Sequence, residues 1–271
     1  MVSSEPNGNG VSSEANWRQN FPQGDLWVFG YGSLIWKPPP HYDQRIPGYI
    51  NGYVRRFWQV CLTDHRGTPQ NPGRVLTVID REFWETLDDP LSHHETSTTD
   101  TATVWGAAYH IPASHANEVR EYLDDREIDG YTDHYTPFHP VVGSSSTSTS
   151  TSTSTSTSIT ITSKGAIADS SPISCMVYIG QPTNPQFLRD PTQREQQAVA
   201  EVISRSEGAS GKNAEYLFML EKALTGLGFG DAEMHVVDLV RRVKALQREE
   251  DVQREEADAQ REMERAWRGA E

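Results

Sequence analysis

The sequence has little cysteine and no long apolar run. Its 271 residues include two cysteines, Cys61 and Cys175, which lie far apart within apolar, strand-like segments. In a reducing compartment this arrangement favours two buried thiols over a disulfide. No stretch of about 18 apolar residues occurs, and no basic N-terminal segment precedes an apolar one, so we expect neither membrane insertion nor export. These absences predict a cytoplasmic protein.

Positive charge is also scarce. The chain carries 24 Lys and Arg against 38 Asp and Glu, a formal net charge of −14. Such a charge repels phosphate backbones and anionic lipid, so we expect no nucleic-acid partner and no membrane partner. A small-molecule ligand fits this composition better. The oligomeric state remains open.

Large apolar residues are rare at both ends of the chain. We therefore expect a disordered N-terminal tail over 1–24, one folded domain over 25–247, and a charged C-terminal helix or tail over 248–271. Two polar stretches interrupt the domain, at 88–101 and at 143–165, and the second is built largely of Ser and Thr. Neither has an apolar face to bury, so both are expected to form surface loops.

The periodicity of the domain predicts strands first and helices mostly last. Helix starts are expected near Ser114, at Thr192 with Glu195 as a capping box, at Asn213 and at Asp231. This order favours an α+β fold, a small mixed β-sheet or barrel flanked by helices. The expected strands are Leu26–Phe29, Tyr49–Val60, Arg74–Ile79, Val104–Ile111 and Ile173–Ile179.

The glycine-rich turn after the first expected strand lacks the features of a nucleotide-binding loop. Gly30-Tyr31-Gly32 is followed by Ile35 where a dinucleotide fingerprint has its third glycine, and the Gly-Lys-Ser/Thr of a Walker loop is missing. Three prolines at 38–40 also prevent a helix from starting there. The turn is therefore either a plain tight turn or a site whose N–H groups hold a carboxylate.

Metal-binding patterns are missing as well. His93 and His94 lie in the first polar stretch, and His134 and His139 flank Pro137, with no recognised ligand spacing. We expect no metal site and no metal cofactor.

Several segments between Leu26 and Val240 occur in an order typical of one family. They are LWVFGYGSLIWKP, RIPGYINGYVRRFWQ, Asp64–Gly67 with Pro72–Val75, Trp105–Tyr109, Tyr122–Tyr131, Tyr178–Gly180 and Gly211–Leu217. Each segment alone is weak evidence for any family. Together they resemble the ChaC family of glutathione-specific γ-glutamyl cyclotransferases.

The resemblance implies that the substrate's α-amine attacks its own γ-carbonyl, which would convert glutathione into 5-oxoproline and Cys-Gly without a cofactor. Glu127 is implied as the carboxylate that accepts and then donates the proton, which requires burial to raise its pKa. Without the resemblance, Arg126-Glu127 would be read as a surface charge pair. The residues implied to bind the γ-glutamyl unit are Tyr31, Gly32, Ser33, Leu34, Ile35 and Trp36, mainly through backbone groups, and Tyr178.

Two other functions stay open. Ring closure uses only the glutamyl half of the substrate, so the chain could be a broader cyclotransferase acting on other γ-glutamyl amines or γ-glutamyl amino acids. A catalytically silent protein that binds γ-glutamyl compounds is the alternative from another class.

Overall fold

The computed structural model describes residues 17–62, 65–89, 91–92, 102–127, 130–141 and 171–268. The predicted loop over 143–165, most of the one over 88–101, and His93 and His94 lie outside the described residues. Asp89, inside the first predicted loop, is buried instead. Its carboxylate accepts hydrogen bonds from Arg56 Nε at 2.7 Å and Trp84 Nε1 at 2.8 Å, which hold it in the core.

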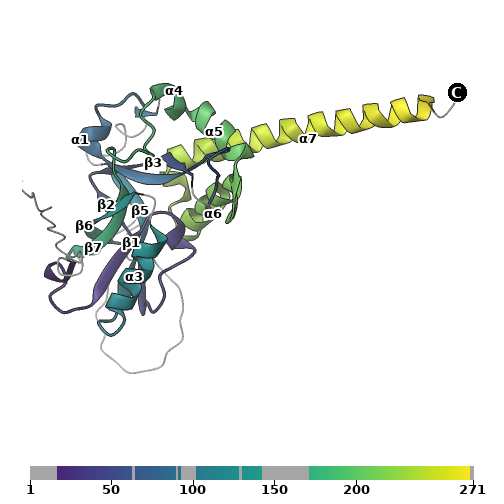
Figure 1. Cartoon of the computed structure of the whole chain (residues 1–271). Coiled ribbons are helices and arrows are strands. Elements are labelled where there is room, and N and C mark those ends of the chain that lie inside the picture. The colour runs from purple at the N-terminus through teal and green to yellow at the C-terminus, as the bar shows by residue number, and fades with distance from the viewer. Residues whose placement is uncertain are drawn as a thin grey trace, which may run out of the picture.

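Five strands close into a barrel in the order β1-β5-β2-β6-β7. The neighbours run antiparallel, except that β1 and β7 pair in parallel where Val28 faces Met176. Helices flank the barrel, so the expected α+β fold with a small barrel is confirmed (Figure 1). The strands are β1 Leu26–Gly30, β2 Gln44–Asn51, β5 Thr103–Ile111, β6 Tyr131–Pro140 and β7 Ile173–Gly180.

A separate two-stranded sheet is formed by β3 (Tyr53–Cys61) and β4 (Gly73–Asp80). The single strand predicted over Tyr49–Val60 was wrong, because Gly52 turns the chain between β2 and β3 with a φ of +83°. Strand β6 was not predicted. Its ten residues include two prolines and few β-branched side chains, and it is defined by its register against β7.

Three of the four expected helix starts shift along the chain. Asp190, not Thr192, caps the segment before Gln196, because its carboxylate accepts the Thr192 N–H at 2.9 Å. The helix expected at Ser114 begins at Ala116, and the one expected at Asp231 begins at Met234. The helices are α1 Arg81–Trp84, α3 Ala116–Arg126, α4 Pro191–Arg194, α5 Gln196–Arg205, α6 Asn213–Gly226 and α7 Met234–Arg268, with short 3₁₀ turns η2 Trp17–Gln19, η3 Ser33–Ile35 and η4 Gly230–Ala232, and a two-residue pair β8 Glu207–Gly208 and β9 Gly211–Lys212.

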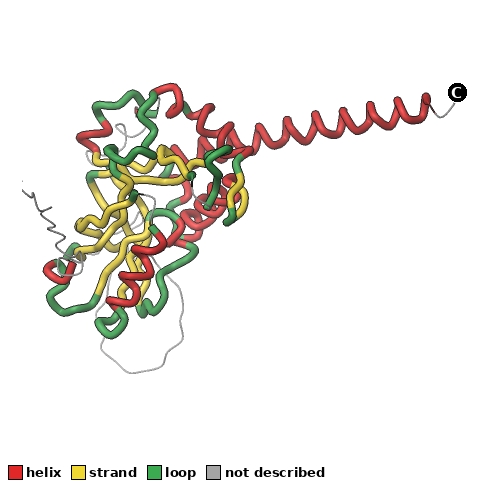
Figure 2. Tube along the Cα trace, in the orientation of Figure 1, coloured by secondary structure: helices red, strands yellow, loops and turns green. Residues whose placement is uncertain are grey.

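The apolar core has two parts. The larger joins the barrel and the β3–β4 sheet to α5, α6 and the first turns of α7, while the smaller lies between α3 and β1. Figure 2 shows the strands in the body with helices on two sides of them. The smaller part includes Trp17 and Phe21, whose rings lie 6.3 Å apart and are buried. The predicted disordered tail therefore does not extend to residue 24, because these two aromatic rings anchor the chain from Trp17 onward.

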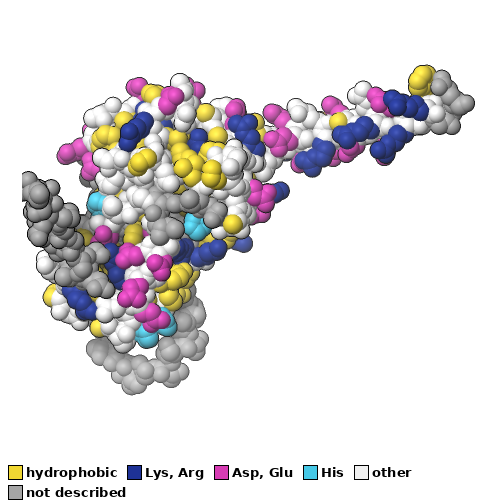
Figure 3. All heavy atoms as spheres, in the orientation of Figure 1, with side chains coloured by type: hydrophobic (Ala, Val, Ile, Leu, Met, Phe, Trp, Pro, Cys, Tyr) yellow, Lys and Arg dark blue, Asp and Glu magenta, His cyan; other side chains and the backbone are white. Residues whose placement is uncertain are grey.

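Helix α7 has a buried first part and an exposed second part. Val236, Leu239 and Val243 are buried against the body, whereas the charged segment after Gln247 projects away from it (Figures 1 and 3). Among the described residues, no helix is both long and apolar enough to cross a membrane.

Candidate active site

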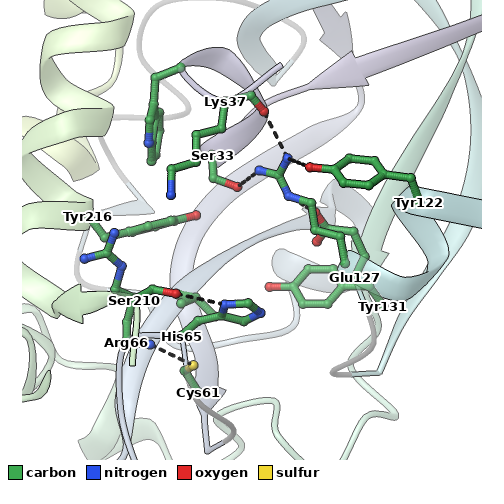
Figure 4. Close-up of a pocket in the computed structure, with 13 residues that line it drawn as sticks. Ser33, Lys37, Cys61, His65, Arg66, Tyr122, Glu127, Tyr131, Ser210 and Tyr216 are labelled. Carbon is green, nitrogen blue, oxygen red and sulfur yellow. Dashed lines mark hydrogen bonds and ion pairs between the residues drawn. The ribbon is translucent and has the colours of Figure 1, made fainter. Parts of the chain in front are cut away.

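A pocket opens beside the turn that follows β1. It has an outer part of about 270 Å³ and an inner part of about 40 Å³. The wall shared by the two parts consists of Ser33, Glu127, Tyr131 and Tyr216. Figure 4 shows Glu127 and Tyr131 on one side of the pocket and Tyr216 on the other. The shared wall draws on four separate segments, namely η3, the end of α3, β6 and α6.

Two glycines allow the chain to turn tightly at η3. A Cβ at Gly30 would come within 2.6 Å of the Leu34 Cβ, so a larger residue there would force the turn to shift. A Cβ at Gly32 would lie 3.2 Å from the Tyr216 hydroxyl, so its absence leaves the backbone open to the inner pocket. The first N–H groups of a helical turn have no partner within it, and here they belong to Gly32, Ser33 and Leu34. The turn therefore directs N–H donors at the inner pocket, and that they hold a carboxylate stays a prediction.

Glu127 lies at the C-terminal end of α3. Its N–H donates to the Leu123 carbonyl at 2.9 Å, and its carboxylate lies 3.6 Å from Arg126 Nε, with about 20% of the side chain exposed. Arg126 in turn donates to Ser33 Oγ at 2.9 Å and to the Lys37 carbonyl at 3.0 Å. Arg126 therefore ties the helix end to the turn and fixes Glu127 relative to Ser33. That burial raises the pKa of Glu127 stays a prediction.

Four tyrosines lie close enough to Glu127 for its charge to act on them. Burial, followed by the charge of Glu127, raises the pKa of Tyr31 and of Tyr216. Burial also dominates at Tyr131 and at Tyr178, where the pKa is raised despite the opposing effect of Arg120 on Tyr178. All four phenols are therefore neutral near pH 7, and none of them adds a negative charge near Glu127.

The structure brings most of the predicted site residues together. Ile35 is the exception, because its side chain is buried in the larger core and lines neither part of the pocket. The predicted residues that line the pocket are Tyr31, Gly32, Ser33, Leu34, Trp36, Glu127 and Tyr178.

The hydroxyl of Tyr178 is already engaged in hydrogen bonds. The hydroxyl donates to Asp124 at 2.9 Å and accepts a hydrogen bond from Arg120, and both partners belong to α3. Its backbone carbonyl accepts the Tyr31 hydroxyl at 2.8 Å. Through these hydrogen bonds Tyr178 connects β7 to α3 and to the turn.

Sequence reasoning left several lining residues unassigned. Tyr131 and Tyr216 lie within segments that carried the family resemblance, and that position was the only signal for them. The lining residues that had no predicted role are Lys37, Cys61, His65, Arg66, Val75, Leu76, Tyr122, Arg126, Tyr131, Ser210 and Tyr216, with Phe29 in the inner part. Cys61 and Cys175 are buried and are not joined in a disulfide, as predicted.

Asn213 and Arg74 belong to the scaffold. The Asn213 amide accepts the Arg74 N–H at 2.7 Å and donates to the Arg74 carbonyl at 2.8 Å, and it is fully buried. This pair of bonds fastens the start of α6 to β4 and thereby places Tyr216 against the pocket.

One group among the described residues has the composition of a metal site. His41, His115 and Glu118 have ligand atoms within 4.8 Å of one another at the start of α3. Both imidazoles lie near the Glu118 carboxylate, at 3.4 and 3.3 Å. None of the three lines the pocket.

Comparison with known proteins identifies the family. The sequence model of the ChaC-like protein family matches residues 26–246. The chain belongs to the ChaC-like family. This ChaC-like chain is 42% identical over 227 residues to a protein of Schizosaccharomyces pombe named glutathione-specific γ-glutamylcyclotransferase, covering 82% of this chain and 94% of the relative. A protein of the same name from Saccharomyces cerevisiae is 41% identical over 206 residues, covering 73% and 85%.

Solved structures agree with this ChaC-like assignment. A crystal structure of a γ-glutamyl cyclotransferase specific to glutathione from yeast superposes with a TM-score of 0.64 at 35% identity. The match covers 82% of this chain and 99% of the yeast chain. The fold of this ChaC-like protein is therefore the fold of that enzyme.

Proposed function

We propose that this chain is a cytoplasmic, glutathione-specific γ-glutamylcyclotransferase, a carbon–nitrogen lyase that converts glutathione into 5-oxoproline and Cys-Gly. The observation that carries the proposal is the position of Glu127. Its carboxylate lies on the wall between a small inner pocket and a larger outer one, beside the backbone of the η3 turn. The names of the relatives at 41–42% identity support the same activity.

The geometry suits a reaction within one molecule. The inner part is lined by Gly32, Ser33 and Leu34 of the turn and by tyrosine rings, which fits a γ-glutamyl unit whose α-carboxylate accepts turn N–H groups. Holding that unit in a folded conformation places the α-amine against the γ-carbonyl, and proximity then replaces a protein nucleophile. Both reacting groups belong to the substrate, so the chemistry calls for no metal or redox cofactor.

Glu127 serves the two proton transfers that ring closure requires. It accepts a proton from the α-ammonium, and the free amine then adds to the γ-carbonyl carbon to form a tetrahedral oxyanion. As the oxyanion collapses, the ring nitrogen gives up its extra proton to solvent and the bond to the cysteine nitrogen breaks. The cysteine amine leaves with the proton returned by Glu127. The neutral Tyr216 hydroxyl beside Gly32 and the N–H groups of the turn are the donors at hand for the oxyanion.

The experiment that tests the proposal is incubation of the purified chain with glutathione and, separately, with γ-glutamyl-alanine. We expect 5-oxoproline and Cys-Gly from glutathione, with much slower turnover of γ-glutamyl-alanine. Equal turnover of both compounds would make the chain a broader cyclotransferase. Turnover of neither, with binding still measurable by calorimetry, would make it a silent binding protein.

A further inference from the structure

The outer part of the pocket is basic although the chain as a whole is acidic. Lys37, Arg66 and Arg126 line it, together with His65, and Glu127 is the one carboxylate among the described lining residues. The inner part has no Lys or Arg among its described lining residues. In a chain with a net charge of −14, this concentration of positive charge indicates that the outer part binds an anion.

Two of the three basic side chains, those of Arg126 and Arg66, make structural contacts. Arg126 donates to Ser33 and to the Lys37 carbonyl. Arg66 donates to the Lys212 carbonyl at 2.9 Å, lies 3.4 Å from Glu215, and is almost fully buried with its guanidinium over the Tyr216 ring. These contacts keep both guanidinium groups in place at the cavity.

Lys37 differs from them. Its backbone is fixed at both ends, because its N–H donates to the Ser33 carbonyl at 2.8 Å and its own carbonyl accepts from Arg126. Among the residues that the structure describes, its ammonium has no hydrogen-bond or ion-pair partner. In Figure 4, Lys37 and Ser33 lie along one edge of the pocket, and Arg66, His65 and Ser210 line the edge that faces them.

We infer that the outer part is the subsite for the departing dipeptide, and that Lys37 binds its C-terminal carboxylate in the field of Arg66. This inference rests on the proposed function, since it assumes that Glu127 and the turn hold the γ-glutamyl unit. The γ-carbonyl then points from the inner to the outer part, and the remainder of the substrate must occupy the outer part. Of the groups in that remainder, the terminal carboxylate is the permanent negative charge that a free ammonium recognises.

The subsite gives a physical reason for substrate selection. A γ-glutamyl amine has no carboxylate beyond the scissile bond, and a γ-glutamyl amino acid has its carboxylate one residue closer to that bond. Neither compound places a carboxylate at the position that the C-terminal carboxylate of a γ-glutamyl dipeptide occupies. Lys37 is therefore a specificity-determining residue rather than a catalytic one.

The test compares glutathione with its C-terminal amide, in which glycinamide replaces glycine. Wild-type enzyme should prefer the acid, and Lys37→Met should lower kcat/KM for glutathione by about 10- to 100-fold, mainly through KM, because hydrogen bonds to charged groups contribute about 1.5–3 kcal/mol. Turnover of the amide should be the same in wild type and variant. Lys222→Met is the matched control, because Lys222 is exposed on α6 and does not line the pocket.

The possible outcomes separate the inference from the proposed function. If wild type cleaves acid and amide equally well, or if Lys37→Met slows both by the same factor, the carboxylate subsite is wrong while the cyclotransferase activity stands. If wild type releases 5-oxoproline from neither compound, the proposed function itself fails. If Lys222→Met lowers kcat/KM for glutathione as much as Lys37→Met does, the decrease comes from the change in net charge, and the assignment of Lys37 is overturned.

Discussion

At the scale of single residues, the position of Glu127 depends on how α3 ends. Its N–H completes the last helical turn, and the chain then leaves the helix with Glu127 at a φ of −102°. Arg126 is held by the η3 turn, so the neighbouring carboxylate is directed into the pocket instead of into solvent. A charge pair that the sequence alone places on a surface thus becomes part of a cavity wall.

Replacing Glu127 with Gln tests the proton-transfer role directly. The amide keeps the size of the side chain but accepts no proton, so kcat should fall by about 10²- to 10⁴-fold with little change in KM. The measurement is the rate of Cys-Gly release from glutathione by variant protein whose circular dichroism matches wild type. Glu249→Gln, at an exposed position of α7, should be silent. A Glu127→Gln rate within about tenfold of wild type would refute the role of this residue, because it is below the range for a positioned acid–base group.

Asn213 is a single residue for which we predict a clear effect on the stability of the fold. Asn213→Ala leaves the buried N–H and carbonyl of Arg74 without partners, at about 1–3 kcal/mol for each group. We expect the urea midpoint to fall accordingly, measured by fluorescence, and KM to rise because α6 no longer holds Tyr216 at the pocket. Gln193→Ala, which removes an exposed amide from α4, should change stability by less than about 0.5 kcal/mol. Equal midpoints for the two variants would show that the Asn213 bonds contribute nothing.

At the scale of elements, β6 and β7 show how an insertion can be accommodated. Phe138 faces Ile173 in the register of this antiparallel pair, so the ends of the two strands lie next to each other. A connection of any length between them leaves the barrel pairing in place, since the entropy of closing a loop grows slowly with its length. We propose that the segment over 143–165 is an insertion within one catalytic domain spanning 25–247.

Helix α7 supplies the prediction for the C-terminal boundary. Residues 248–268 are exposed apart from the half-buried Ala257, so a chain ending at Gln247 should keep its melting temperature within about 2 °C and its full activity. Thermal unfolding followed by circular dichroism is the measurement. A chain ending at Arg242 is the control, because it loses the fully buried Val243 together with Leu246 and should melt clearly lower, by the equivalent of about 1.5–3 kcal/mol for each buried side chain. If both truncations destabilise equally, the projecting segment is part of the folded domain.

At the scale of the whole molecule, two histidines make stability depend on pH in opposite directions. His235 is fully buried and accepts the Phe57 N–H at Nε2, and burial together with Arg56 and Arg55 lowers its pKa well below the ordinary value. At His110, burial lowers the pKa, but hydrogen bonds from its ring to Asp43 and Asp25 outweigh this effect and raise it. The first histidine is therefore neutral in the folded chain near pH 7, and the second keeps its proton to a higher pH than a histidine of the unfolded chain does.

The sign of each effect follows from the unfolded chain, in which both pKa values are about 6.5. The contribution of His235 is present above pH 6.5 and is lost as the pH falls below it, because only the unfolded chain then takes up the proton. The contribution of His110 is present below pH 6.5 and is lost as the pH rises through its raised pKa. In urea unfolding between pH 5 and 8, His235→Gln should flatten the rise of stability with pH, and His110→Gln should steepen it. Identical slopes in both variants and wild type would contradict the assignment.

The sequence by itself determined the features that depend on local order along the chain. The run from Leu26 to Trp36, the succession of strands before helices, and the family segment around Glu127 all follow from neighbouring residues, and they predicted the barrel and the centre of the site. Only the tertiary structure decided which distant side chains meet there. Tyr131, Tyr216 and Arg66 come from β6, α6 and the loop before β4, and Ile35 turns into the core while its neighbours line the pocket. Periodicity specifies which face of an element is apolar. The pairing of β6 with β7 and of α6 with β4 is made by contacts between residues 35 or more positions apart, such as Phe138 with Ile173 and Asn213 with Arg74, and no local pattern encodes such contacts.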